Sequence, residues 1–71
     1  MCRSQISVGL KVRYKGDSVV PPCVGYVTYI SRPVEGENVE GYAIVQLNKK
    51  PEHWPYLDLD FAPRIEDLEK V

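Results

Sequence analysis

Residues that commonly build catalytic and metal sites are scarce in this 71-residue chain, which has one His and two Cys. A structural zinc site needs about four Cys or His ligands in closely spaced pairs, and Cys2, Cys23 and His53 form no such pair. Cys2 lies in a terminus expected to fray and Cys23 at the start of an expected strand, so both are predicted to be free thiols. We therefore expect no metal site and no bound cofactor.

An excess of charge of one sign is also missing. Nine Lys and Arg residues against ten Asp and Glu residues give a net charge of -1, which removes the long-range attraction to phosphate that non-specific nucleic-acid binders use. Nucleic acid is therefore a disfavoured partner. A nucleic-acid- or ribosome-associated barrel is an alternative function, and its phosphate contacts would be Lys11, Arg13, Lys15, Lys49 and Lys50.

Long apolar segments are absent as well. No apolar run approaches the roughly 20 residues of a membrane-spanning helix, and the N-terminal sequence "MCRSQISVGL" lacks the apolar stretch of a signal peptide. We expect a cytoplasmic protein with a flexible N-terminus at 1–8 and one domain at 9–71. Because a core of this size supplies only about 3–5 kcal/mol, we also expect a homo-oligomer, either a dimer or a tetramer, or another protein partner.

What the chain does contain is a series of short β-rich segments separated by turns. The polar segment 32–41 is expected to be a loop with a mobile tip, and Gly25 indicates a bulge or sharp bend within a strand. The pattern predicts an all-β fold, a single five-stranded barrel, with an open sheet as the alternative. The expected strands are 10–15, 23–31, 41–48 and 56–61, followed by a 3₁₀ turn at 65–68 and a closing strand at 69–71.

The segment 56–61 alternates between apolar and polar side chains. Asp58 and Asp60 fall on its outer face, where their carboxylates are a candidate for weak binding of a divalent cation. A solvated strand face is the favoured interpretation, because Ca²⁺ sites usually need about six or more oxygens. The alternation assigns three apolar side chains to the core: Leu57, Leu59 and Phe61.

The segments "GLKVRYKG", "GYVTYI", "GYAIVQL" and "PRIEDLEKV" together resemble SH3-like barrels over about residues 9–71. Within that group, "VRYKG", "VGYV" and "EGYAI" are similar to the plasmid-borne type II dihydrofolate reductases, which act as tetramers around a central pore. The resemblance implies a short 3₁₀ turn before the last strand. It also implies an alternative function, an oligomeric reductase-like barrel that binds a nucleotide or pterin in a pore. The family's catalytic tetrapeptide Val-Gln-Ile-Tyr has no counterpart in this chain, so no catalytic residue is assigned.

The stretch "PEHWPYLDLDFAP" at 51–63 holds the only His, Trp and Phe residues of the chain. No Ser or Cys nucleophile lies at a spacing that would make His53 a general base, so enzyme activity is not favoured. Prolines in the loop reduce the entropy lost on ordering, and His53, Trp54 and Tyr56 form the expected interface group. In the alternative, Trp54 plugs one end of the barrel. The predicted function is a small, stand-alone, non-catalytic interaction module that self-associates through the loop at 51–56.

Overall fold

The computed structural model describes residues 1–33, 36 and 40–71 of the chain. In chain order, the elements are η1 (Arg3–Gln5), β1 (Lys11–Tyr14), β2 (Cys23–Ile30), β3 (Ala43–Leu47), β4 (Asp60–Phe61), η2 (Ile65–Asp67) and β5 (Leu68–Lys70). The η elements are 3₁₀ turns. The predictions of an all-β fold and of a 3₁₀ turn before the last strand are confirmed. The polar loop expected at 32–41, with its mobile tip, lies largely outside the described residues.

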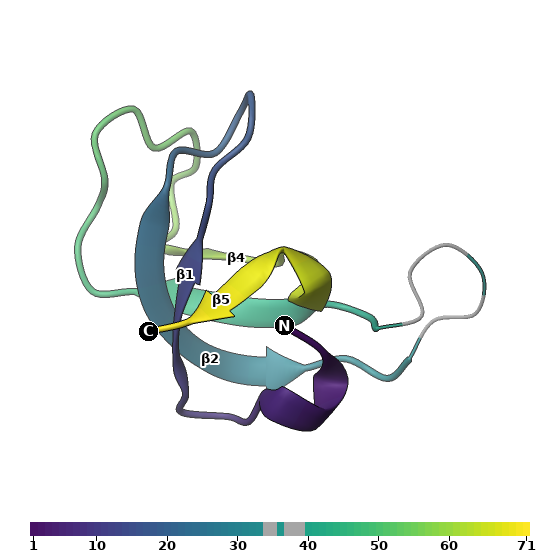
Figure 1. Cartoon of the computed structure of the whole chain (residues 1–71). Coiled ribbons are helices and arrows are strands. Elements are labelled where there is room, and N and C mark those ends of the chain that lie inside the picture. Colours follow the sequence, from purple (N-terminus) through teal and green to yellow (C-terminus); the bar gives the residue numbers. More distant parts are fainter. Residues whose placement is uncertain (34–35, 37–39) are drawn as a thin grey trace.

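The strands form one five-stranded antiparallel sheet in the order β4-β3-β2-β1-β5. β2 curves strongly along its length, and β1 and β3 pair with its two edges (Figure 1). β4 and β5 are the outermost strands, and no pairing joins them in the part of the chain that the structure describes. The five-stranded sheet is therefore established, and its closure into a barrel stays a prediction.

Side chains alternate between the core and solvent along the sheet, as the period of two in a strand requires. On β1, Val12 and Tyr14 are buried while Lys11 and Arg13 are exposed. Fully burying an aliphatic side chain stabilises the fold by about 1.5–3 kcal/mol. The most deeply buried side chains come from strands distributed across the sheet and from η2: Val12, Val27, Val45, Ile65 and Leu68.

Gly25 lets β2 and β3 approach each other closely. It pairs with Val12 on β1 and with Leu47 on β3. A Cβ atom at this position would lie 2.6 Å from the carbonyl oxygen of Gln46. The register shift lies between Val27 and Tyr29, so the bulge in β2 is not at Gly25.

We predict that Gly25→Ala lowers the free energy of unfolding by about 1–3 kcal/mol, because the added methyl group forces β3 away from β2. Urea denaturation followed by circular dichroism measures this change. Val24→Ala is the matched control, since the neighbouring side chain is half exposed and its truncation costs about 0.5 kcal/mol or less. Equal stability of Gly25→Ala and the wild type would contradict the close approach of the two strands.

The expected fourth strand at 56–61 is wrong in its extent, because only Asp60–Phe61 forms β4. Leu57, expected in the core, is 98% exposed. The cause is Trp54, whose indole N–H donates a hydrogen bond of 2.8 Å to the backbone carbonyl of Asp58. This bond holds the backbone at Asp58 against the indole, and the pairing of the segment with β3 begins only beyond it, at Asp60. From there, the remaining apolar side chains of the segment pack against the core: Leu59 and Phe61.

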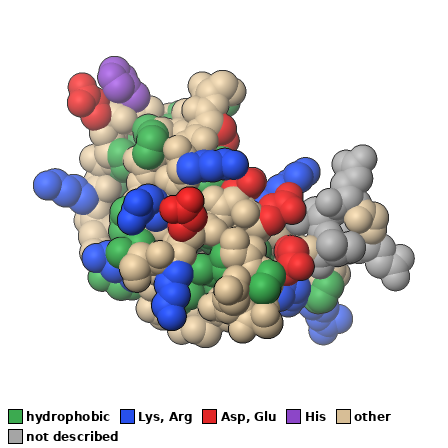
Figure 2. All heavy atoms as spheres, viewed as in Figure 1, with side chains coloured by type: hydrophobic (Ala, Val, Ile, Leu, Met, Phe, Trp, Pro, Cys, Tyr) green, Lys and Arg blue, Asp and Glu red, His purple; other side chains and the backbone are tan. Residues whose placement is uncertain are grey.

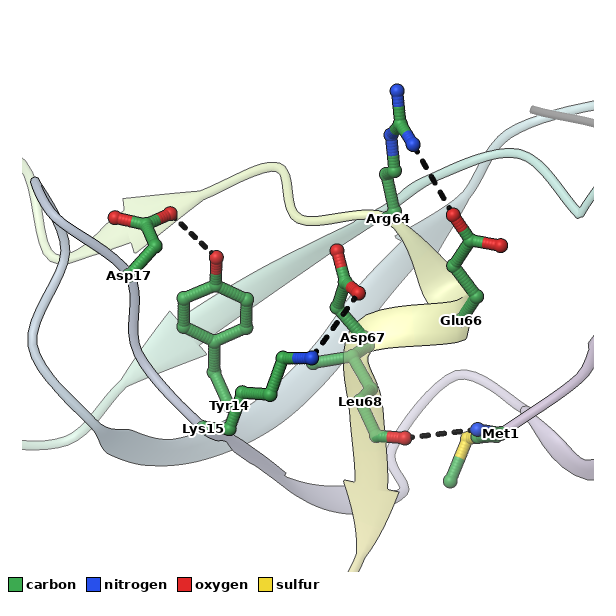
Figure 3. A network of polar contacts seen from close by, with 8 residues as sticks. All are labelled: Met1, Tyr14, Lys15, Asp17, Arg64, Glu66, Asp67 and Leu68. Atoms are coloured by element: carbon green, nitrogen blue, oxygen red, sulfur yellow. Dashed lines mark hydrogen bonds and ion pairs between the residues drawn. The ribbon is translucent and has the colours of Figure 1, made fainter. Parts of the chain in front are cut away.

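Residues 1–8 lie against the end of the sheet. The N-terminal amine of Met1 donates a hydrogen bond of 3.0 Å to the carbonyl of Leu68 (Figure 3). Ile6 belongs to the core, and the backbone N–H of Arg3 donates to the carboxylate of Glu40 over 2.6 Å. These contacts give the segment a defined place, and its expected flexibility stays a prediction. Among the described residues, no helix combines the length and apolar character needed to cross a membrane.

Candidate interaction surface

The connection between β3 and β4 contains a turn at 51–54. The backbone N–H of Trp54 donates a hydrogen bond of 3.2 Å to the carbonyl of Pro51. His53 adopts a left-handed backbone conformation with φ of 65°, a region that His occupies more often than most non-glycine residues do. The imidazole Nε2 lies 3.6 Å from the carboxylate of Glu52, and both side chains are exposed. His53 is therefore presented at the tip of the loop.

Trp54 points inward from this turn and is only 6% exposed. Its ring makes edge contacts with Tyr56 and Phe61, each with a centroid separation of 5.4 Å. Aromatic pairs in this geometry stabilise a fold by about 0.5–1.5 kcal/mol beyond the area that they bury. Because little of the indole surface is accessible to a partner, the position of Trp54 agrees with the alternative prediction. In that alternative, the Trp54 side chain fills one end of the barrel.

We predict that Trp54→Ala lowers the free energy of unfolding by about 3–5 kcal/mol, because it removes a buried indole and leaves a cavity. Urea melts followed by far-ultraviolet circular dichroism measure this loss. Trp54→Phe is the matched control, since it keeps an aromatic ring in the core while removing the second ring of the indole and its hydrogen bond to Asp58. A native melting curve for Trp54→Ala would show that the indole is not a core group.

Two adjoining hollows lie beside this loop. The first hollow, of about 640 Å³, is lined by residues 55–58 and 60–62. The second hollow, of about 290 Å³, continues from it, because both are lined by Tyr56, Phe61 and Ala62. Leu57 lies at the first hollow with almost its whole side chain in solvent. Together, these residues form an open face that combines apolar walls with a projecting leucine.

Asp17 organises the loop that borders the second hollow. One carboxylate oxygen accepts hydrogen bonds of 2.7 Å from the backbone N–H groups of Val19 and Val20. The other accepts a hydrogen bond of 2.6 Å from the hydroxyl of Tyr14 (Figure 3). This bond, followed by burial, raises the pKa of Tyr14 to about 12. The same hydroxyl and the two amides lower the pKa of Asp17. Neither residue was singled out as a loop organiser from the sequence.

The raised pKa of Tyr14 predicts a loss of stability at alkaline pH. The folded state holds the phenolic proton more tightly than the unfolded state, whose tyrosines ionise near pH 10. This contribution is therefore complete below about pH 10 and is lost as the pH rises toward about 12. Absorbance titration of phenolate, with Tyr14→Phe to assign the late proton, measures the pKa directly.

Asp17→Asn is the matched variant for this titration, because the amide oxygen can still accept from the two backbone N–H groups while the charge is removed. We expect the pKa of Tyr14 to fall toward its ordinary value in this variant. A pKa of Tyr14 that is ordinary in the wild-type protein, or unaltered by Asp17→Asn, would contradict the hydrogen bond.

Asp58 and Asp60, the candidate cation ligands, both line the first hollow. Within residues 1–33, 36 and 40–71, no group of three or more His, Cys, Asp or Glu side chains is placed to hold a metal ion. Two carboxylates fall short of the six or more oxygens that Ca²⁺ usually takes. Asp58 and Asp60 add negative charge to the surface at the first hollow.

The basic residues predicted as phosphate contacts are divided between two regions. Lys11 and Arg13 lie on the outer face of β1, where Arg13 is directly opposite Glu69 on β5. Lys15 lies 3.9 Å from the carboxylate of Asp67. Figure 2 shows Lys and Arg side chains interspersed with Asp and Glu on this side of the molecule, which weakens the field that a polyanion would meet. The remaining pair follows β3 in the connection to β4: Lys49 and Lys50.

Both cysteines are free thiols. Cys23 is buried at the start of β2, and this burial raises the pKa of its thiol. Cys2 lies before η1, where a hydrogen bond with the Ser4 hydroxyl lowers the pKa of its thiol. The two residues thus belong to different environments, and neither lines the two hollows.

Comparison of this chain with protein family models, with curated proteins and with solved structures found no match. Its function is therefore argued from the surface itself. The residue that sequence reasoning misplaced, Leu57, is the most exposed large apolar side chain of that surface.

Proposed function

We propose that this chain is a small, cytoplasmic, non-catalytic interaction module that folds as an SH3-like barrel and self-associates through the loop at 51–56 and its continuation to residue 62. The observation that carries the proposal is the open hollow at 55–62, with Leu57 98% exposed beside it. His53 and Tyr56 are presented to the partner, and Trp54 supports them from the core.

The barrel part of the proposal is supported by the order of the strands and by the position of η2. The antiparallel order β4-β3-β2-β1-β5 places the last strand beside the first one, and the 3₁₀ turn η2 connects β4 to β5. The 3₁₀ turn is the feature that the resemblance to SH3-like barrels implies. The strong curvature of β2 brings the sheet toward closure (Figure 1).

Self-association is supported by the way Trp54 holds its neighbours. Tyr56 is 45% exposed, yet its ring packs at 83° against the indole, so it is ordered before any partner arrives. Binding then costs less side-chain entropy than it would for a free tyrosine. Covering the apolar surface of Leu57 and Tyr56 contributes about 25 cal/mol for each Å² removed from water. A second copy of the chain is the simplest partner, because it is present wherever the protein is.

We predict that the protein forms oligomers at micromolar concentrations, and sedimentation velocity over a concentration series tests this directly. The weight-average mass should rise above the 8.1 kDa of one chain as the concentration increases. Tyr56→Ala should shift the curve to higher concentrations, because it removes part of the presented surface. A single species of 8.1 kDa over the whole series would refute self-association.

A further inference from the structure

We infer that the self-associated form is a two-fold dimer in which Leu57 of each copy enters the first hollow of the other copy. In the same contact, Lys49 and Lys50 face Asp58 and Asp60 of the other copy. This inference rests on the proposed function and specifies how the second copy occupies the surface at 55–62.

The shape of the surface supports this arrangement. A two-fold contact uses the same patch on both copies, so the patch must be complementary to itself. Leu57 projects with 98% of its surface in solvent, and the hollow that it borders has apolar walls from Pro55, Phe61 and Ala62. Each copy therefore offers one projecting side chain and one cavity within a single patch. Exchanging the two leucines fills both hollows at once.

The charged residues of the surface also provide both halves of a contact, because basic and acidic side chains lie in one patch. Lys49 and Lys50 lie near the start of the connection from β3 to β4, Asp58 lies near its end, and Asp60 begins β4. The pairing of Gln46 with Asp60 holds these two ends next to each other at one edge of the sheet.

All four charged side chains belong to exposed residues. Ion pairs in the described part of the chain join Lys15 to Asp67, Glu52 to His53 and Arg64 to Glu66, so none of the four is engaged. In a two-fold dimer, the segments between β3 and β4 of the two copies can run in opposite directions. The lysines of one copy then lie against the aspartates of the other copy. Such pairs fix the register of an interface and speed the encounter of its partners.

A dimer contact must extend beyond the first hollow. A stable interface buries about 800 Å² on each partner, and the accessible surface of one chain is 4810 Å². Leu57 and its hollow alone are too small for this. The second hollow extends the same face from Tyr56 to Arg64 and to Asp17, so the contact can continue to the loop between β1 and β2.

The first experiment compares Leu57→Ser with Val8→Ser by sedimentation equilibrium. Val8 is also an exposed aliphatic residue, at 65%, and lines neither hollow. Leu57→Ser should raise the Kd of the dimer at least about 30-fold, the effect of losing a central contact residue. Val8→Ser should leave it within about twofold. Because Leu57 is outside the core, both variants should retain the wild-type melting curve.

The second experiment exchanges the charges. The variant Lys49→Glu/Lys50→Glu and the variant Asp58→Lys/Asp60→Lys should each dimerise more weakly than the wild type, because like charges then face each other. An equimolar mixture of the two should form a heterodimer, since every facing pair becomes opposite in sign. Native mass spectrometry separates the heterodimer from the two homodimers.

The outcomes separate this inference from the proposed function. A wild-type protein that remains a monomer refutes both. A wild-type dimer with an unaltered Kd for Leu57→Ser, or equal weakening by Val8→Ser, overturns the two-fold arrangement while self-association stands. A mixture of charge variants with no heterodimer likewise overturns the arrangement alone, and shows that a different face of the chain makes the contact.

Discussion

The hydrogen bond from the Trp54 indole to the Asp58 carbonyl is the interaction on which the proposed surface depends. A buried indole N–H without an acceptor costs about 1–3 kcal/mol, so the backbone between Trp54 and Asp58 must fold back to supply one. That requirement ends the strand pattern early and directs Leu57 into solvent. It also brings Tyr56 against the indole, where the ring forms part of the proposed surface. One buried side chain thereby determines which neighbours are exposed.

The sheet provides the rigid support for this connection. Gly25 permits the close approach of β2 and β3, and the bond between the N–H of Leu47 and the carbonyl of Leu59 fixes the end of the connection to β3. On the opposite side, Asp17 holds the loop between β1 and β2 through its two amide bonds and the Tyr14 hydroxyl. The second hollow lies between these two supported segments, since residues of both line it.

The regular strands were predictable from sequence because their signal is local. Alternation at 10–15 identified the buried and exposed faces of β1, and the β-branched run at 23–31 identified β2. The same rule failed at 56–61, where the alternation is equally clear, because the competing bond from Trp54 is not visible in a period-two pattern. Arg13 lies opposite Glu69 because the first and last strands pair, and no local sequence pattern predicts this pairing. The bond between Tyr14 and Asp17 joins the end of β1 to the loop that follows it, and no strand or turn pattern in the sequence predicts it.

The most direct test of this account is the hydrogen exchange rate of the Trp54 indole N–H, measured by nuclear magnetic resonance in a dilute sample of the wild-type protein. The chain has one Trp, so its signal is unambiguous. The account predicts slow exchange at every dilution, because the N–H is buried and bonded to Asp58 within a single copy. Exchange as fast as that of a free indole, or protection that disappears on dilution, would show that Trp54 is covered only by a partner and would contradict the origin proposed for the exposed Leu57.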